Sequence, residues 1–239
     1  MARAPRVVVA GELHYVLQRG HNQQAVFVDD VDREAYRGML RDAARHHGVA
    51  IHAYALLDAE VQFLATPRSS EALSRSMQSL GRRYVAAFNR RHGRSGSLWE
   101  GRFRACVVDG ASLGVQALVH VETLAARTGL VTAASEWPWS SAEHHLGRRR
   151  DPMVTEHSAY WSLGNTPFER ELAHANVIHE GLSTALTERF GRSVLQGRAL
   201  GPAHFSARIE ELTGVPQHAR PRGRPAHTSN DEIQKTVPN

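Results

Sequence analysis

Residues 49–67, VAIHAYALLDAEVQFLATP, contain two apolar runs that are separated by a short turn. We interpret residues 49–57 and 60–66 as adjacent strands, because a two-residue turn joins them and a proline ends the second. The polar side chains of Glu60 and Gln62 interrupt the second run. Since successive side chains of a strand point to opposite faces, both polar groups lie on the same face of the predicted sheet.

The segments on both sides of this hairpin complete a mixed order of strands and helices. The residue patterns predict strands over residues 12–18 and 102–108, and helices over residues 29–47, 70–92 and 111–127. The order β-α-β-β-α-β-α predicts an α+β fold of the ferredoxin-like type, a split βαβ sandwich with helices on one face of an antiparallel sheet. We expect the other face of the sheet to be available for a site.

Changes in composition along the chain predict three regions. Residues 1–147 hold the ferredoxin-like domain, and residues 148–215 form a helical C-terminal extension that begins with the linker-like run RRRDP. Residues 216–239 are rich in Pro, Arg, Gly and Thr, which is typical of a flexible basic tail.

The composition favours a globular protein with an anionic partner. Of the 239 residues, 41% are hydrophobic, which is enough to bury a core. Lys and Arg together number 29 against 24 for Asp and Glu, and the isoelectric point is near 10. Because arginine pairs with phosphate through two parallel hydrogen bonds, nucleic acid is the simplest such partner.

The cysteine content and the N-terminal segment bear on the cellular compartment. Cys106 is the only cysteine, so the chain forms no intrachain disulfide and no cysteine-based zinc site, and we expect this thiol to be buried. The apolar run over residues 7–10 is too short for a signal peptide or a membrane span. We therefore expect a soluble cytoplasmic protein that does not contact a membrane.

Residues 81–105, GRRYVAAFNRRHGRSGSLWEGRFRA, hold seven arginines and a single acidic residue. We call these arginines the arginine cluster and predict that they bind DNA, because arginine neutralises phosphate. In the same segment, Trp99 follows Gly and Ser residues and could stack on an unpaired base, although large aromatic residues more often pack into a core. The arginine cluster consists of Arg82, Arg83, Arg90, Arg91, Arg94, Arg102 and Arg104.

The tail carries a second basic motif, Arg-Gly-Arg-Pro, within residues 220–225. Such a narrow, extended segment can lie in the minor groove of A·T-rich DNA, with its guanidinium groups in the negative potential of the groove. We expect Arg220, Arg222 and Arg224 to contact DNA in this way.

Two pairs of adjacent histidines, His46-His47 and His144-His145, could suggest a metal site. Neighbouring side chains on a helix point about 100° apart, so such a pair does not easily hold one ion. With 15 histidines in the chain, we expect positions at the surface or at helix ends.

Several stretches together resemble the REP-associated tyrosine transposases, which are single-tyrosine members of the HUH class. They include PRVVVAGELHYVLQRG (5–20), LGRRYVAAFNRRHGRSGSLWEGRF (80–103), WPWSSAEHHLG (137–147) and FSARIEELTG (205–214). The resemblance spans nearly the whole chain. It implies a ferredoxin-like nuclease core that binds single-stranded or hairpin DNA from repeated palindromes.

The resemblance also implies a catalytic centre, and the sequence departs from it at each chemical position. Active members carry a His-hydrophobic-His strand that holds a divalent cation, and a helix with a nucleophilic tyrosine and a polar metal ligand one turn further on. The histidine pair aligns with Glu60 and Gln62, the tyrosine with His120, and the polar ligand with Leu124. We call these four positions the vestigial centre.

Our hypothesis is a DNA-binding protein that derives from such a transposase and has lost catalysis, with no catalytic residues, metal or other cofactor. It would act as a regulator of transcription or an architectural factor at the nucleoid, on a DNA hairpin, single strand or A/T-rich duplex. One alternative is an active transposase or nicking enzyme in which Glu60 and Gln62 hold Mg²⁺ or Mn²⁺. A second alternative is a protein-interaction module without DNA binding. The sequence leaves the oligomeric state open.

Overall fold

The computed structural model describes residues 6–217 and contains a four-stranded antiparallel sheet. β1 lies inside the sheet and pairs with both β3 and β4. This arrangement confirms the predicted ferredoxin-like α+β fold, in which the first and third strands are central. The strands are β1 (Leu13–Arg19), β2 (Val49–Leu57), β3 (Glu60–Pro67) and β4 (Arg104–Val108), in the order β2-β3-β1-β4.

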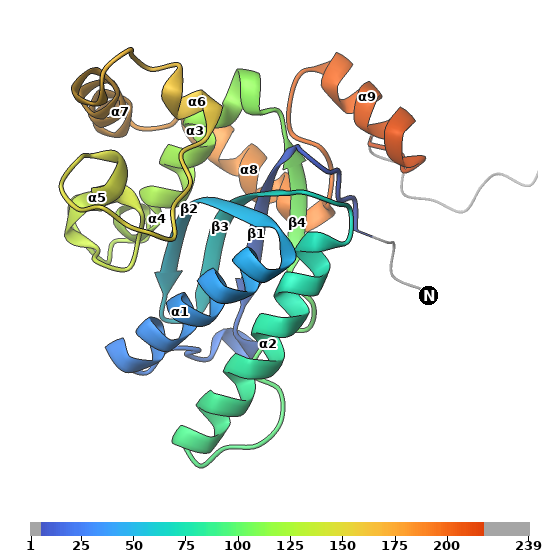
Figure 1. Cartoon of the computed structure of the whole chain (residues 1–239), viewed down its shortest axis with the longest axis vertical. Coiled ribbons are helices and arrows are strands. Elements are labelled where there is room, and N and C mark those ends of the chain that lie inside the picture. The colour runs from blue at the N-terminus through green and yellow to red at the C-terminus, as the bar shows by residue number, and fades with distance from the viewer. Residues whose placement is uncertain (1–5, 218–239) are drawn as a thin grey trace, which may run out of the picture.

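Two helices, α1 (Asp30–His47) and α2 (Ala72–Arg91), cover one face of the sheet (Figure 1). α1 begins after Asp29, whose carboxylate accepts a hydrogen bond from the backbone of Asp32. It ends at Gly48, which has the left-handed φ of 69° that favours glycine. The helices and the sheet share an apolar core that includes Val16, Tyr36, Leu40, Phe63, Leu73, Leu80 and Tyr84.

Two further helices, α3 (Gly110–Glu122) and α8 (Thr184–Gln196), cover the opposite face of the sheet. Leu118 of α3 and Phe190 of α8 belong to one buried cluster with Leu64 of β3. The sequence analysis did not foresee that α8 covers this face, where a pocket between α8, α3 and the sheet remains available for a site. The physical reason for this covering is that α8 is amphipathic, and it removes its apolar side from water by packing on the sheet.

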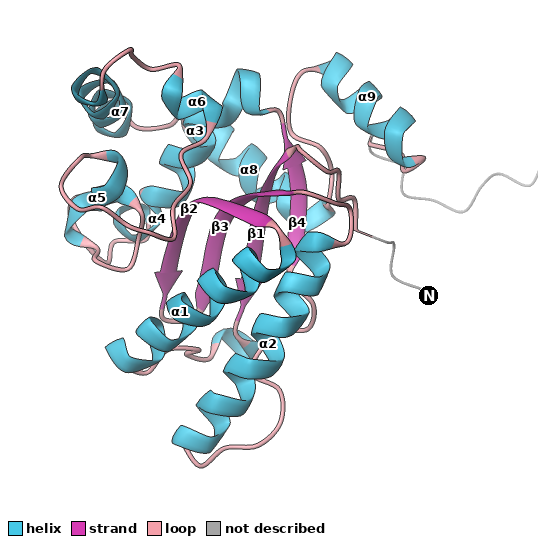
Figure 2. Cartoon of the chain, in the orientation of Figure 1, coloured by secondary structure: helices cyan, strands magenta, loops and turns pink. Residues whose placement is uncertain are grey.

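The remaining elements connect the two layers and extend the second one (Figure 2). The helix that we predicted over residues 111–127 is broken, since α3 ends at Glu122 and a separate short helix follows. These elements are η1 (His21–Gln23), α4 (Leu124–Arg127), η2 (Ala134–Glu136), α5 (Ala142–His145), α6 (Ser158–Trp161), α7 (Pro167–Glu180) and α9 (Ala203–Thr213).

The helices beyond residue 148 are not packed around a core of their own. Phe190, Val194 and Leu200 lie in the same buried cluster as residues of all four strands. Within residues 6–217, no helix combines the length and the apolar composition that a membrane crossing would need.

Candidate nucleic-acid interface and vestigial centre

The fold brings the four positions of the vestigial centre together at one end of the sheet. Glu60 and Gln62 lie on the face of β3 beneath α3, as the alternation of strand side chains predicts. Together with His120 of α3 and Leu124 of α4, they line a pocket of about 230 Å³. The positions that the resemblance assigned to one catalytic centre are therefore neighbours in space.

A chain of hydrogen bonds occupies the oxygen atoms of this pocket. The hydroxyl of Tyr15 donates to Oε1 of Gln62 at 2.5 Å, and Nε2 of Gln62 donates to Oε1 of Glu60 at 2.7 Å. Nε of Arg19 donates to the other carboxylate oxygen of Glu60 at 2.8 Å. The oxygens that would have to hold a metal ion here already accept hydrogen bonds from protein groups.

His120 lies where the resemblance expects a nucleophile, but its side chain is buried beneath α8. It is 3% exposed, and its ring stacks on Phe190 with a centroid distance of 4.5 Å. Burial, with a smaller contribution from Arg127, lowers the pKa of His120 to about 3, so its imidazole is neutral near pH 7. The hydroxyl oxygen of Tyr15 lies 3.3 Å from Nε2 of His120. Burial raises the pKa of the Tyr15 phenol.

Leu124 completes the pocket with a buried, apolar side chain. It offers no lone pair to a metal ion. The vestigial centre thus contains a neutral imidazole, an amide, a carboxylate in an ion pair and a hydrocarbon.

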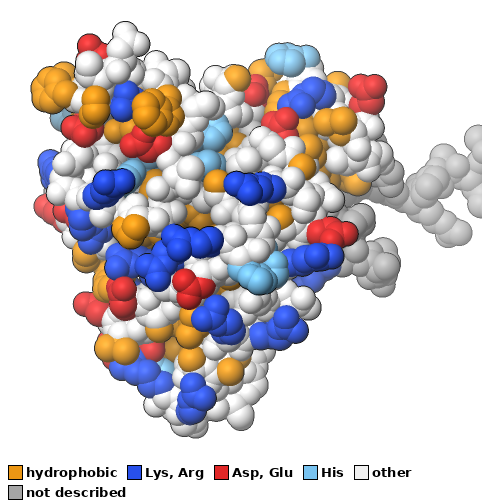
Figure 3. Space-filling view, in the orientation of Figure 1, with side chains coloured by type: hydrophobic (Ala, Val, Ile, Leu, Met, Phe, Trp, Pro, Cys, Tyr) orange, Lys and Arg blue, Asp and Glu red, His pale blue; other side chains and the backbone are white. Residues whose placement is uncertain are grey.

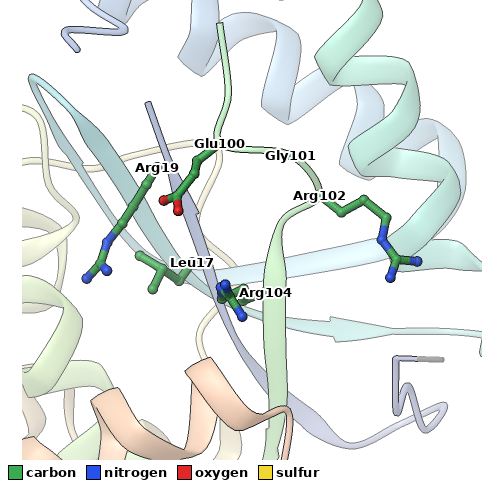
Figure 4. A pocket seen from close by; sticks show the side chains of 6 residues that line it. All are labelled: Leu17, Arg19, Glu100, Gly101, Arg102 and Arg104. Carbon is green, nitrogen blue, oxygen red and sulfur yellow. The ribbon is translucent and has the colours of Figure 1, made fainter. Parts of the chain in front are cut away.

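Positive charge lines the mouth of the vestigial pocket. Arg19 and Arg127 contribute to its wall. A smaller depression beside it, seen in Figure 4, is lined by Arg19, Arg102 and Arg104, together with Glu100. The sequence analysis missed Arg19; the signal that could have found it is its place at the end of β1, two residues after Leu17 on the same face.

The seven residues of the arginine cluster fall into two groups. Four have partners: Arg91 pairs with Asp29 and Asp32, Arg83 approaches Asp42 at 3.8 Å, Arg94 donates to Gln24, and Arg104 donates to the carbonyl of Leu195. Arg82, Arg90 and Arg102 are exposed, and within residues 6–217 they take part in no hydrogen bond or ion pair.

Trp99 does not lie where a base-stacking residue would have to be. Its side chain is 6% exposed and packs among the rings of Tyr36 and Tyr84, at centroid distances of 6.0 and 6.2 Å. The predicted contact with an unpaired base is contradicted by this position. The large ring fills the core beneath α1 and α2, because burying it there removes much apolar surface from water.

The tail arginines Arg220, Arg222 and Arg224 lie outside the described residues. Their predicted contact with a minor groove stays a prediction.

His145 lies at the end of α5, in line with the expectation of helix ends, but its side chain is completely buried, which the sequence analysis did not foresee. Nδ1 of His145 lies 2.6 Å from one carboxylate oxygen of Glu122, and Nε2 of His174 lies 2.7 Å from the other. Burial alone would raise the pKa of Glu122, but the two imidazoles outweigh it and hold this pKa well below its usual range. No local pattern could reveal the cluster, because His174 is 52 residues from Glu122.

Comparison with known proteins gives matches among solved structures. No family model and no curated protein matches the chain. A REP-associated tyrosine transposase bound to a REP hairpin matches with a TM-score of 0.53 and 17% identity, covering 66% of this chain and 96% of that one. The chain shares the fold of that transposase. A "putative transposase" from Deinococcus radiodurans matches with a TM-score of 0.35 and 20% identity, covering 48% of this chain and 93% of that one.

Proposed function

We propose that the chain is a DNA-binding protein that derives from a REP-associated tyrosine transposase and no longer cleaves DNA. The observation that carries this proposal is the state of the vestigial centre, where the four expected catalytic positions line one pocket, Glu60 and Gln62 are joined by hydrogen bonds, and Leu124 is apolar. Phosphodiester cleavage by this class needs an accessible nucleophile and an open metal site. His120 is buried against Phe190, Glu60 is held in an ion pair with Arg19, and Leu124 offers no ligand atom.

The DNA-contacting surface in this proposal lies at the same end of the molecule. The C-terminal half of α2 and the segment that leads into β4 present Arg82, Arg90 and Arg102, which have no protein partner within residues 6–217. Figure 3 shows basic side chains spread over the region of α1 and α2, with acidic ones between them. Guanidinium groups without a carboxylate partner are free to pair with phosphate.

The proposed target is a DNA hairpin. The transposase that shares this fold has a REP hairpin bound to it, which supports a folded DNA element as the partner of this chain. Binding without cleavage suits a regulator or an architectural factor, and binding to chromosomal DNA implies association with the nucleoid.

The proposal is tested by measuring the affinity for labelled hairpin, single-stranded and duplex DNA against salt concentration. We expect the affinity for a hairpin to fall steeply with salt. The variant R82Q/R90Q/R102Q should bind more weakly and reduce the log–log salt slope by about 2 to 3, since each lost phosphate contact changes the slope by about 0.9. Arg45→Gln is the control, because Arg45 is also exposed but lies in the last turn of α1. The end of α2 that carries Arg90 lies instead at the start of α1, where Arg91 pairs with Asp29.

Incubation with the same DNA in Mn²⁺ tests the loss of catalysis. We expect neither cleavage nor a covalent adduct. Cleavage that disappears in the Glu60→Ala variant would contradict the proposal and favour an enzyme with oxygen ligands. If no DNA shows salt-dependent binding, the chain is instead a protein-interaction module.

A further inference from the structure

Three helices meet at a buried cluster of ionisable side chains that lies outside the lining of the vestigial pocket. Glu122 ends α3, His145 ends α5, and His174 lies within α7. All three side chains have no exposed surface. Their potential ligand atoms, a carboxylate oxygen and one nitrogen of each ring, all lie within 4.8 Å of one another.

Within residues 6–217, no lysine or arginine forms an ion pair with the carboxylate of this cluster. Besides the two imidazoles, Glu122 accepts a hydrogen bond from the hydroxyl of Ser141 at 2.6 Å. The ring of Tyr160 packs against both imidazoles, with centroid distances of 4.6 Å to His145 and 5.6 Å to His174. A carboxylate that is fully buried away from solvent needs a positive charge next to it.

A proton and a divalent cation are the two ways to supply that charge. A proton requires only one imidazole beside the carboxylate. Here two imidazoles from different helices direct one nitrogen each to the same carboxylate, and a hydroxyl completes a fourth direction. Either way the second ring nitrogens, Nε2 of His145 and Nδ1 of His174, have no hydrogen-bond partner in the part of the chain that the structure describes, so they do not separate the two cases. The number of groups around the carboxylate separates the proton from the cation. Two imidazoles and a hydroxyl surround Glu122, whereas a proton would need only one imidazole.

We propose that Glu122, His145 and His174 bind one divalent transition-metal ion, and that zinc matches this ligand set best. Two imidazole nitrogens and a carboxylate oxygen are a common zinc ligand set, and the hydroxyl of Ser141 or the second oxygen of Glu122 is placed to fill the fourth position. The expectation of a chain without metal came from the vestigial centre and from the histidine pairs, and it did not foresee this cluster.

Small movements suffice to admit the ion. Zinc bonds of about 2.0 to 2.1 Å in a tetrahedron place ligand atoms about 3.3 Å apart. The nitrogen–oxygen distances of 2.6 and 2.7 Å would therefore widen by less than about 1 Å, and ligand atoms that now lie up to 4.8 Å apart would approach one another by up to about 1.5 Å. Because every ligand is fully buried, no coordination position opens to a substrate. The ion is structural, and it ties α5 and α7 to α3.

The test begins with the full chain, purified without a histidine tag and dialysed against metal-free buffer. Its zinc content is measured by mass spectrometry of the element, and we expect about one zinc per chain. Treatment with a chelator should lower the melting temperature, and added Zn²⁺ should restore it. Co²⁺ added to the chelated protein should give the visible absorption of a tetrahedral site with nitrogen and oxygen ligands.

The variant His174→Gln should lose the zinc and the Co²⁺ spectrum. His179→Gln is its control, because His179 lies on the same helix but is exposed. If His174→Gln does not fold, the Co²⁺ titration of the unmutated chain decides the question. A chain that holds no zinc, gains no Co²⁺ absorption and melts at the same temperature with or without chelator would overturn the proposal. The positive charge of the cluster would then be a proton.

Discussion

Tyr15 is the residue that closes the vestigial centre, since its hydroxyl donates to Gln62 and lies beside His120. The variant Tyr15→Phe leaves the amide oxygen of Gln62 buried without its donor. We expect this change to lower the free energy of unfolding by about 1 to 2 kcal/mol. The measurement is urea unfolding followed by tryptophan fluorescence.

Tyr36 offers a matched control for this prediction. Its side chain is as deeply buried as that of Tyr15, but its hydroxyl has no hydrogen-bond partner within residues 6–217. We expect Tyr36→Phe to change the stability by less than about 0.5 kcal/mol, or to stabilise the protein slightly. Equal losses in the two variants would show that the hydrogen bond to Gln62 contributes nothing measurable.

Sequence reasoning placed single residues correctly where a local rule applies to them. The period of two in a strand put Glu60 and Gln62 on one face, and the structure confirms it. Local rules left open whether Trp99 stacks on a base or packs into the core, and they allowed His145 at a helix end without showing that it is buried. Only the tertiary fold decides that both side chains are buried.

At the scale of elements, α8 determines whether the vestigial pocket is open. Phe190 is completely buried and contacts both Tyr15 and His120. We expect Phe190→Ala to cost about 3 to 5 kcal/mol of unfolding free energy, because it removes a large apolar side chain and leaves a cavity. Chemical denaturation measures this loss.

Phe168 of α7 is the control for this substitution. It is 71% exposed, so Phe168→Ala should change stability by less than about 0.5 kcal/mol. A large loss for Phe168→Ala, or a small one for Phe190→Ala, would contradict the packing of α8 on the sheet.

The elements themselves were largely predictable, and their docking was not. The two-residue turn within residues 49–67 and the glycine at position 48 are local signals, and they located the hairpin and the end of α1. The prediction of a helical extension over residues 148–215 is consistent with α8, which has an apolar side. It does not say that this side meets the sheet above His120, because partners far apart in sequence leave no local signal.

For the whole molecule, buried histidines predict how stability depends on pH. Burial is the main cause that lowers the pKa of His14 and of His52 to about 4 in the folded state. His52 also lies beside His157, with the ring centroids 4.9 Å apart. In the unfolded chain both groups have a pKa near 6.5, so the unfolded state binds protons first as the pH falls. Their contribution to stability is complete above about pH 6.5 and is lost progressively toward pH 4.

Each of these histidines should remove about 1.4 kcal/mol of unfolding free energy per pH unit well inside that window. Denaturant titrations at several values between pH 7.5 and pH 5 measure the slope. His52→Gln should reduce the slope of unfolding free energy against pH by the contribution of one histidine, about 1.4 kcal/mol per pH unit. His179→Gln, at an exposed position, should leave the slope unchanged. A stability that stays constant across this range would show that both imidazoles accept a proton without unfolding.

The position of α8 also sets an order for biosynthesis. The sheet is complete once β4 has been made, yet the side chains that cover its second face, Phe190 and Val194, follow more than 80 residues later. During translation this apolar face of the sheet stays exposed until α8 has been synthesised. The nascent chain therefore cannot reach its final stability until nearly all of residues 6–217 have left the ribosome. A product that stops before residue 184 would be a substrate for chaperones and proteases rather than a smaller working domain.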